Sequence, residues 1–319
     1  MNDKKHIPLS VIIPTLNRKN ILSNTIDSLL SGEFVPSEII VIDQSEEVLS
    51  AQLHSEWDGI VKVFKEDILS SARARNIGVR KASNDIILFC DDDIEVNETT
   101  IKDLYKEMLR EDISLIAAVN CVDNAAYGYQ KKKHRIIRNI AGYVIGTRIP
   151  RKSGGYIIKW SMKGHYSEGM TKPHRTEWAY GFFFSVKKSL IEKWDIWFDE
   201  NLIKYAFAED MDFSCRYCRC SEVDGLKTIV DPRLYVHHLI SKEWRMPSEE
   251  AIFYGFVNRW YLSYKLFPKQ WWYRIGMVWS DIWYTLLVYK KGERKLGFKS
   301  MLRTYRQIGN LREGNIKRG

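Results

Sequence analysis

The stretch that decides the fold is IILFCDDD, residues 86–93. Five apolar residues in a row predict a buried strand, and three carboxylates follow where that strand should leave its sheet. Crowded carboxylates repel one another, and a hard divalent cation such as Mg²⁺ or Mn²⁺ relieves that repulsion. A cation of this kind suggests a ligand whose charge still needs neutralising, most often a diphosphate. The alternative interpretation is a solvated acidic turn after a strand.

The composition is that of a globular protein with one unusual end. The chain has 319 residues, 45% of them hydrophobic and 28% charged, with a high aromatic content of 13%. The net charge of +9 belongs to the C-terminal quarter, because 16 basic and 6 acidic residues follow from Lys242 onward. No apolar leader precedes the first strand, and Ile275–Tyr289 is too short to span a membrane, so we expect neither a signal peptide nor a spanning helix.

The five cysteines are an odd number without a disulfide-like spacing, which favours a reduced, cytoplasmic protein. Cys215, Cys218 and Cys220 resemble part of a zinc site. No second cysteine pair completes a tetrahedral set, and the three lie in a predicted helix, so zinc is disfavoured.

Short apolar strands alternate with helices over the first 120 residues. The pattern predicts strands at 9–13, 38–42, 60–64, 86–90 and 113–119, and helices near 21–30, 72–82 and from 98. This alternation is typical of a parallel sheet with helices on both faces. Ligands bind at the carboxyl ends of strands in such sheets, which places Thr15, Asp43 and residues 91–93 on one rim.

The later part of the chain is less regular at first. Residues 120–176 predict loops and short strands that shape a pocket, and regular structure resumes at 178–186. Helices are expected at 187–194 and 208–220, then a strand at 226–230, followed by residues 235–238 with the two histidines. We therefore expect a nucleotide-sugar-binding half (1–120), an acceptor-binding half (121–245) and a basic, aromatic helical region (246–319).

Six segments in order resemble the inverting family 2 glycosyltransferases, which have the GT-A fold. They are the first strand with its Pro14-Thr15 end, the second strand ending in Asp43, Ala74-Arg75-Asn76-Ile77-Gly78, the Asp91–Asp93 cluster, the segment from Trp178 to Glu200, and Glu209-Asp210 followed by a late histidine. Their order over roughly 230 residues makes coincidence a poor explanation. One departure is Asp43-Gln44-Ser45, where many relatives carry a second acid and a glycine.

The resemblance implies transfer of a hexosyl or deoxyhexosyl unit from a nucleoside diphosphate-sugar to an acceptor hydroxyl, with inversion. It implies Asp210 as general base with Glu209 assisting, and Mn²⁺ or Mg²⁺ held by Asp91, Asp93 and a histidine, where His237 is favoured over His238. The residues expected at the donor are Pro14, Thr15, Asn17, Arg18, Asp43, Arg73, Arg75, Asn76, Asp91 and Asp92.

The acceptor is expected to meet Trp178, Tyr180 and Gly181, because sugar C–H faces pack on aromatic rings. Asp43 either accepts a hydrogen bond from uracil or thymine or caps a turn. The donor is expected to be UDP- or dTDP-linked, and the acceptor a glycan or polyprenyl-linked glycan of a surface polysaccharide such as an O-antigen or capsule.

The basic, tryptophan-rich C-terminus predicts helices that sit on anionic lipid. The expected location is therefore the inner face of the cytoplasmic membrane, with peripheral contact; a helical cap on the core or an oligomer contact is the alternative. Other functions fit less well. A nucleotidyltransferase would need a glycine-rich loop near residue 15, where this sequence is poor in glycine. A nucleic-acid-binding function would not account for the three consecutive aspartates. A non-catalytic glycan-binding or assembly protein with the GT-A fold stays open.

Overall fold

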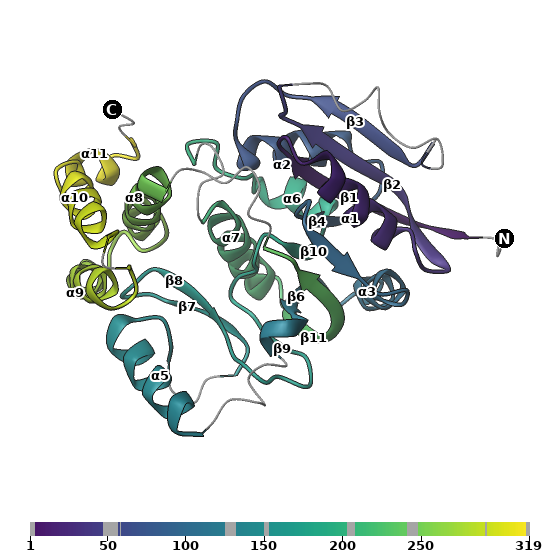
Figure 1. Ribbon diagram of the computed structural model, residues 1–319. Helices are drawn as coiled ribbons and strands as arrows, with labels where there is room; N and C mark the ends of the chain where they lie inside the picture. The colour runs from purple at the N-terminus through teal and green to yellow at the C-terminus, as the bar shows by residue number, and fades with distance from the viewer. Residues whose placement is uncertain are drawn as a thin grey trace.

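A single large sheet organises the protein. The computed structural model describes residues 4–46, 57, 59–124, 132–149, 153–202, 208–240, 248–290 and 292–316. The strands of the large sheet are β1 (Lys5–Thr15), β2 (Phe34–Asp43), β3 (Val61–Lys65), β4 (Ile86–Cys90), β5 (Ile94–Val96), β6 (Ile113–Asn120), β9 (His174–Arg175), β10 (Phe183–Lys187) and β11 (Lys227–His238). They follow the order β3-β2-β1-β4-β10-β6-β11-β5, with β9 paired to β11 (Figure 1).

The sheet is mixed, with a parallel part, as predicted, and a part that contains antiparallel pairs. Strands β3, β2, β1 and β4 run parallel to one another, and β11 runs parallel to β6. Strand β10 lies antiparallel between β4 and β6, so the two predicted halves of the chain share one sheet. The division of the chain at residues 120 and 245 stays a prediction.

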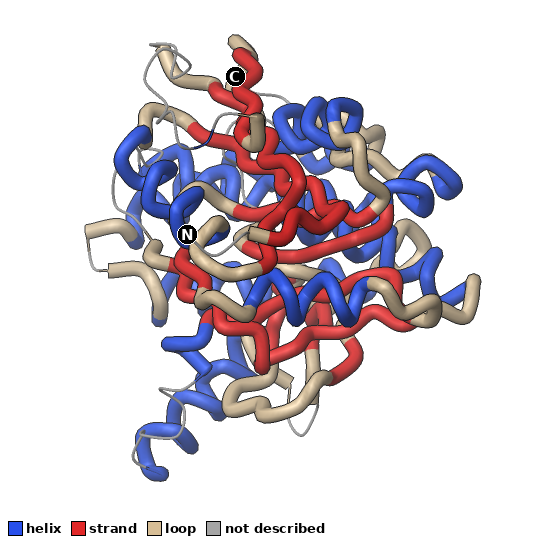
Figure 2. The backbone as a smooth tube through the Cα atoms, turned by 90° about the vertical axis from the view of Figure 1, so that its right-hand side faces the viewer, coloured by secondary structure: helices blue, strands red, loops and turns tan. Residues whose placement is uncertain are grey.

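Helices cover both faces of this sheet, as Figure 2 shows for the red strands between blue helices. The helices are α1 (Lys19–Leu29), α2 (Ser71–Lys81), α3 (Thr100–Met108), α5 (Lys132–Ile145), α6 (Lys188–Trp194), α7 (Glu209–Val223), α8 (Ser248–Leu266), α9 (Trp272–Leu287), α10 (Arg294–Tyr305) and α11 (Ile308–Arg312). A separate hairpin is formed by β7 (Gly155–Ile158) and β8 (Lys163–Tyr166).

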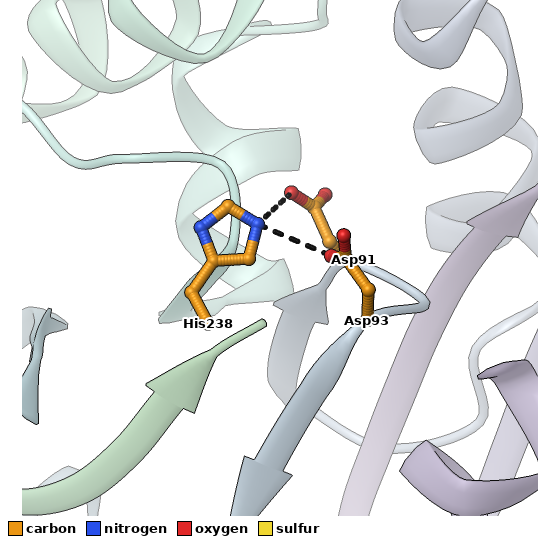
Figure 3. Close-up of side chains that lie close together, drawn as sticks. All are labelled: Asp91, Asp93 and His238. Atoms are coloured by element: carbon orange, nitrogen blue, oxygen red, sulfur yellow. Dashed lines mark ion pairs between the residues drawn. The ribbon is translucent and has the colours of Figure 1, made fainter. Parts of the chain in front are cut away.

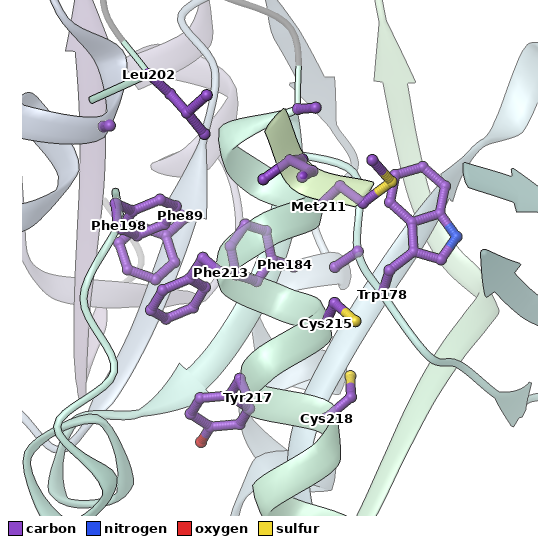
Figure 4. Packing of buried hydrophobic residues seen from close by; sticks show 14 of the residues in the cluster. Phe89, Trp178, Phe184, Phe198, Leu202, Met211, Phe213, Cys215, Tyr217 and Cys218 are labelled. Carbon is purple, nitrogen blue, oxygen red and sulfur yellow. The ribbon is translucent and has the colours of Figure 1, made fainter. Parts of the chain in front are cut away.

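The alternation of side chains along the strands separates two hydrophobic clusters. Ile12 and Phe89 belong to the cluster that includes α2, α7 and α8, whereas Val11 and Leu88 belong to the cluster with α1 and α3. Phe213 of α7 stacks on Phe198, with centroids 4.1 Å apart, and both rings approach Phe89 (Figure 4). This aromatic packing fixes α7, which carries Glu209 and Asp210, against the strand that leads to the three aspartates.

One local prediction is wrong. Residues 132–145 form the 14-residue helix α5, although the sequence predicted loops and short strands there. Strand β10 begins at Phe183, within the segment 178–186 where regular structure was expected to resume. Strand β11 extends beyond the predicted 226–230 to His238, with a change of register after Asp231.

The C-terminal region is helical and aromatic, as predicted. Helix α8 buries Phe253, Phe256 and Trp260, and α9, α10 and α11 pack around it. Within the described residues, no helix combines the length and hydrophobicity needed to cross a membrane.

Candidate functional site

The three aspartates form the turn between β4 and β5. The Thr25 hydroxyl of α1 holds this turn, because it donates to the carbonyl oxygens of Asp92 and Ile94 at 2.7 and 2.9 Å. The Asp92 carboxylate faces β1, where it accepts hydrogen bonds from Thr15 Oγ1 (2.7 Å) and Arg18 Nη1 (2.9 Å). Burial raises the pKa of Asp92 to about 6, while Arg18 and Thr15 oppose that rise.

The pairing of β5 with β11 brings a histidine to this turn. His238 pairs with Ile94, so its neighbour Asp93 lies beside the imidazole. His238 Nε2 is 3.1 Å from Asp93 Oδ1 and 4.0 Å from Asp91 Oδ2 (Figure 3). The ligand atoms of Asp91, Asp93 and His238 all lie within 4.8 Å of one another. Two carboxylates and one imidazole suit Mn²⁺, so these three residues fit a divalent metal.

His238, rather than the favoured His237, therefore approaches the aspartates. Successive side chains of a strand point to opposite faces. His237 Nδ1 lies 3.5 Å from Glu95 Oε2, whereas the His238 ring stacks on Phe182 with centroids 5.0 Å apart. The geometry corrects the preference for His237, which alternation alone could not decide without the partner strand.

Arg75 connects the aspartate turn to the start of α7. Its side chain is only 3% exposed; Nη2 donates to Asp91 Oδ1 at 3.0 Å and Nη1 to Glu209 Oε1 at 2.7 Å. Burial opposes the charged form of Arg75, but Glu209, Asp91 and Asp210 together raise its pKa. The expected role at a phosphate differs from these contacts, since this guanidinium already binds two carboxylates.

Asp210 is the best-placed proton acceptor. Its Oδ2 accepts a hydrogen bond from the Gly181 N–H at 2.7 Å, and its Oδ1 one from the Met211 N–H at 2.7 Å. Burial and the nearby Glu209 raise the pKa of Asp210 to about 7, against the opposing effect of Arg75. Glu209 Oε1, by contrast, is occupied by Arg75 and by the Ser71 hydroxyl at 2.9 Å. Ser71 is a contact that no sequence motif indicated.

Gly181, just before β10, lies close to these groups. A Cβ at this position would lie 3.0 Å from Arg75 Nη2 and 3.3 Å from Asp210 Oδ2. The expected acceptor residues Trp178 and Tyr180 contact each other nearby, with ring centroids 4.2 Å apart. Tyr166 of β8 joins them, with its ring 5.2 Å from Trp178 and 4.9 Å from Tyr180.

A cavity of about 1120 Å³ contains most of the predicted site. This volume exceeds that of a typical cleft for one small molecule, so there is room for a donor and an acceptor together. The predicted residues that line it are Pro14, Arg18, Arg75, Asp91, Asp92, Asp93, Trp178, Tyr180, Gly181, Glu209 and Asp210.

Other residues predicted at the donor lie outside this lining. Asp43 is buried, and its Oδ1 accepts from the Ser45 N–H at 2.9 Å, which is the turn-capping arrangement. Thr15 is also buried and donates to Asp92, as described above. Asn17 Oδ1 accepts from the Glu46 N–H at 3.2 Å.

Two α2 residues hold a neighbouring segment instead. Asn76 bonds both the N–H and the carbonyl of Phe198, and the Arg73 guanidinium pairs with Glu66 and Glu200. Their assignment to the donor stays a prediction, as does that of Thr15, Asn17 and Asp43.

The family follows from a comparison with known sequence families. The sequence model described as Glycosyl transferase family 2 matches residues 10–194, more than half of the chain. The protein belongs to this family. The matched residues include the aspartate turn, Arg75 and Gly181, and His238 and Asp210 follow them in the chain.

Curated relatives of this family 2 protein are distant. It is 25% identical over 238 residues to the uncharacterized glycosyltransferase EpsJ of Bacillus subtilis, covering 72% of this chain and 61% of the relative. It is 24% identical over 240 residues to the hyaluronan synthase of Pasteurella multocida, covering 70% and 24%. The chain thus spans less than two thirds of the length of either relative.

A third relative is the GalNAc(5)-diNAcBac-PP-undecaprenol beta-1,3-glucosyltransferase of Campylobacter jejuni, 29% identical over 192 residues, or 58% of this chain and 53% of the relative. Among solved structures, GalNAc-T7 with UDP, GalNAc and Mn²⁺ superposes with a TM-score of 0.57 at 17% identity, covering 95% of this chain and 56% of that one. This likeness supports the fold, which is the predicted GT-A type with an added helical region.

A measurement of Mn²⁺ binding distinguishes the expected roles of His238 and His237. We expect His238→Ala to weaken Mn²⁺ binding by about tenfold or more, because it removes a ligand that the two aspartates cannot replace. His237→Ala is the matched control and should bind Mn²⁺ as the wild type does. Calorimetric titration with MnCl₂ measures both. Equal weakening in the two variants, or weakening only in His237→Ala, would contradict the assignment.

Proposed function

We propose that this protein is an inverting, metal-dependent glycosyltransferase. It transfers a sugar from a nucleoside diphosphate-sugar to a hydroxyl group of a glycan or lipid-linked glycan acceptor. The observation that carries the proposal is one cavity lined both by Asp91, Asp93 and His238 and by the half-buried carboxylate of Asp210. Asp91, Asp93 and His238 fit a divalent metal, and Asp210 fits a general base.

The proposed reaction is a single displacement at the anomeric carbon. As the acceptor oxygen forms a bond to that carbon, the bond from the carbon to the diphosphate oxygen breaks, and its electron pair leaves with the nucleoside diphosphate. Asp210 accepts the hydroxyl proton, for which a pKa near operating pH is favourable. Attack from the side opposite the leaving group inverts the configuration.

The supporting residues keep Asp210 available for this proton. Arg75 and Ser71 occupy Glu209, so Glu209 is less suited to accept a proton than Asp210. The Gly181 N–H holds Asp210 Oδ2 by one hydrogen bond. We therefore assign Glu209 a positioning role beside the base.

Asp91, Asp93 and His238 would hold Mn²⁺ or Mg²⁺, which when bound neutralises charge on the leaving diphosphate. Arg18 lines the same cavity with its guanidinium 2.9 Å from Asp92. We propose that it faces the donor, for which a UDP- or dTDP-linked sugar is the expected class.

We propose that the acceptor belongs to surface-polysaccharide synthesis and that its sugar packs on Trp178 and Tyr180. The names of two relatives support this class: one is a hyaluronan synthase, and another acts on an undecaprenol-linked glycan. The alternative, a non-catalytic glycan-binding protein with this fold, gives no reason for a raised Asp210 pKa beside a metal-fitting triad.

We also propose peripheral contact with an anionic membrane through an apolar face of two adjoining helices. This face consists of residues that are at least 41% exposed: Ile136, Ile137, Ile140 and Val144 on α5, and Trp271, Trp272, Ile275 and Trp279 at α9. The two helices meet where Trp279 Nε1 donates to the Val144 carbonyl at 2.8 Å (Figure 1). Exposed cations flank α9, namely Lys269, Lys290, Arg294 and Lys295.

Nucleotide binding tests the donor site. We expect one of UDP, GDP, CDP and dTDP to bind in the presence of Mn²⁺ and to lose that binding in excess EDTA, because the carboxylates repel a diphosphate without the cation. Asp93→Ala should lose it as well. The measurement is calorimetric titration, with circular dichroism as the check on folding. If no nucleotide binds the folded wild type, the transferase proposal fails.

The pH profile tests the base. We expect kcat/KM to fall as pH drops below about 7, because protonated Asp210 cannot accept the hydroxyl proton. Asp210→Asn should lower kcat by about 10²- to 10⁴-fold and remove that acidic limb. It should still bind the nucleotide diphosphate with Mn²⁺, which controls for misfolding. Full activity in Asp210→Asn would sink the assignment.

Vesicle binding tests the apolar face. Trp272→Ser with Ile275→Ser should reduce co-sedimentation with phosphatidylglycerol vesicles by about tenfold or more, since each side chain contributes about 1.5–3 kcal/mol on burial. Leu109→Ser is the control, because Leu109 is 58% exposed at the C-terminal end of α3, a helix that lies on the other side of the molecule from α9 in Figure 1. The membrane contact would be refuted if vesicle binding depended neither on the charge of the lipid nor on the double substitution.

A further inference from the structure

Four cations line a second region of the cavity that the proposed reaction does not use. They are Arg138 of α5, Arg148, which follows α5, Lys163 of β8 and Arg259 of α8. We call them the basic compartment. They come from elements grouped together on one side of the molecule, apart from the aspartate turn at β4 (Figure 1).

The compartment holds more positive than negative charge. Glu168 pairs with both Arg138 and Arg148, and Asp281 pairs with Arg259. Among the described residues, these are the carboxylates paired with the compartment, so four cations face two anions. Asp281 also accepts hydrogen bonds from Trp260 Nε1 at 2.8 Å and the Tyr305 hydroxyl at 3.2 Å.

Lys163 is unusual among these cations because it is a lysine ammonium that is largely buried. It is only 9% exposed, its Nζ donates to Ser280 Oγ at 3.3 Å, and it lies 3.6 Å from the centroid of the Tyr284 ring. Burial, followed by the nearby Arg259, lowers the pKa of Lys163 well below its ordinary value. Burying an ammonium this way is costly unless an anion offsets the cost.

Asp281 is the nearby carboxylate that opposes this drop in the pKa of Lys163, but it already pairs with Arg259. His165 lies two residues along β8 and so on the same face as Lys163. Burial, then Arg148, lowers the pKa of His165 to about 4, so its ring is neutral near pH 7. Arg259 already donates to the Gly255 and Ser161 carbonyls and to Asp281. Arg138 and Arg148 are therefore the guanidiniums whose planar N–H donors match phosphate oxygens.

We infer that the basic compartment binds a phosphate or diphosphate group of the acceptor. This inference rests on the proposed function, since it assigns the acceptor of that reaction. The donor diphosphate is assigned to the aspartate turn, which draws on different elements of the same cavity. Ser280 and Tyr284, which contact Lys163, belong to α9, whose exposed side carries Trp272 and Ile275. An acceptor diphosphate inside the cavity would thus lie behind the face proposed to touch lipid.

Metal-free binding of two probes tests the inference. EDTA removes the metal, so the proposed donor site should not bind diphosphate. Under this condition we expect inorganic pyrophosphate and farnesyl diphosphate to bind the wild type in calorimetric titrations. Lys163→Met should weaken both by about tenfold or more, the loss of one charged hydrogen bond. Lys159→Met removes the same charge from the same hairpin at an exposed position outside this cavity and should bind normally.

The two probes distinguish the source of the phosphate. Equal affinities support a phosphate on any acceptor, and tighter farnesyl diphosphate binding assigns it to a lipid. Arg148→Met is a second variant for the case in which Lys163→Met misfolds, because Glu168 keeps Arg138 as a partner. Absent binding, or binding unchanged in both variants, overturns the inference. Retained Mn²⁺-dependent nucleotide binding would then leave the proposed function standing.

Discussion

Arg75 places a positive charge among carboxylates that could not otherwise stand so close. It contacts Asp91 and Glu209 directly, and it opposes the rise in the pKa of Asp210. Removing one partner of such a buried pair costs about 3–5 kcal/mol, because the other charge is left unpaired. The contact also joins the two predicted halves of the chain, since Asp91 follows β4 and Glu209 begins α7. The metal-fitting triad and the proposed base are therefore held relative to each other by one guanidinium.

The short strand β5 determines which residues meet across the sheet. It begins at Ile94, directly after the aspartate turn, and pairs antiparallel with β11. The end of β11 therefore lies against Asp93. Leu239 N–H donates to the Asp93 carbonyl at 2.9 Å and continues that pairing past His238. A change of register by one residue would turn His238 away and bring His237 toward the turn. The triad is thus a consequence of strand register more than of the motif alone.

The sequence was sufficient for the parts that depend on local pattern. Continuous apolar runs predicted β1, β2, β4 and β6, and the acids after β4 predicted the rim of the site. It was not sufficient where a side chain's role depends on a distant partner. From the sequence, Arg75 is expected at a phosphate, and its contact with Glu209 becomes known only from the fold. The choice between His237 and His238 likewise depends on the pairing of β5 with β11. Helix α5 was missed because its stripe of Ile136, Ile140 and Val144 faces outward among glycine and basic residues.

The cavity has opposite charge in its two regions, and this asymmetry bears on how two anionic substrates are kept apart. Without a cation, the aspartate turn repels phosphate, whereas the basic compartment attracts it at any metal concentration. In the proposed reaction a donor diphosphate would be held only together with its metal, and an acceptor phosphate would need none. Asp210, the proposed base, lines the same cavity as both regions. An acceptor anchored by its phosphate would consequently present a hydroxyl to Asp210 from a fixed distance, so the separation of the two charged regions would select which hydroxyl reacts.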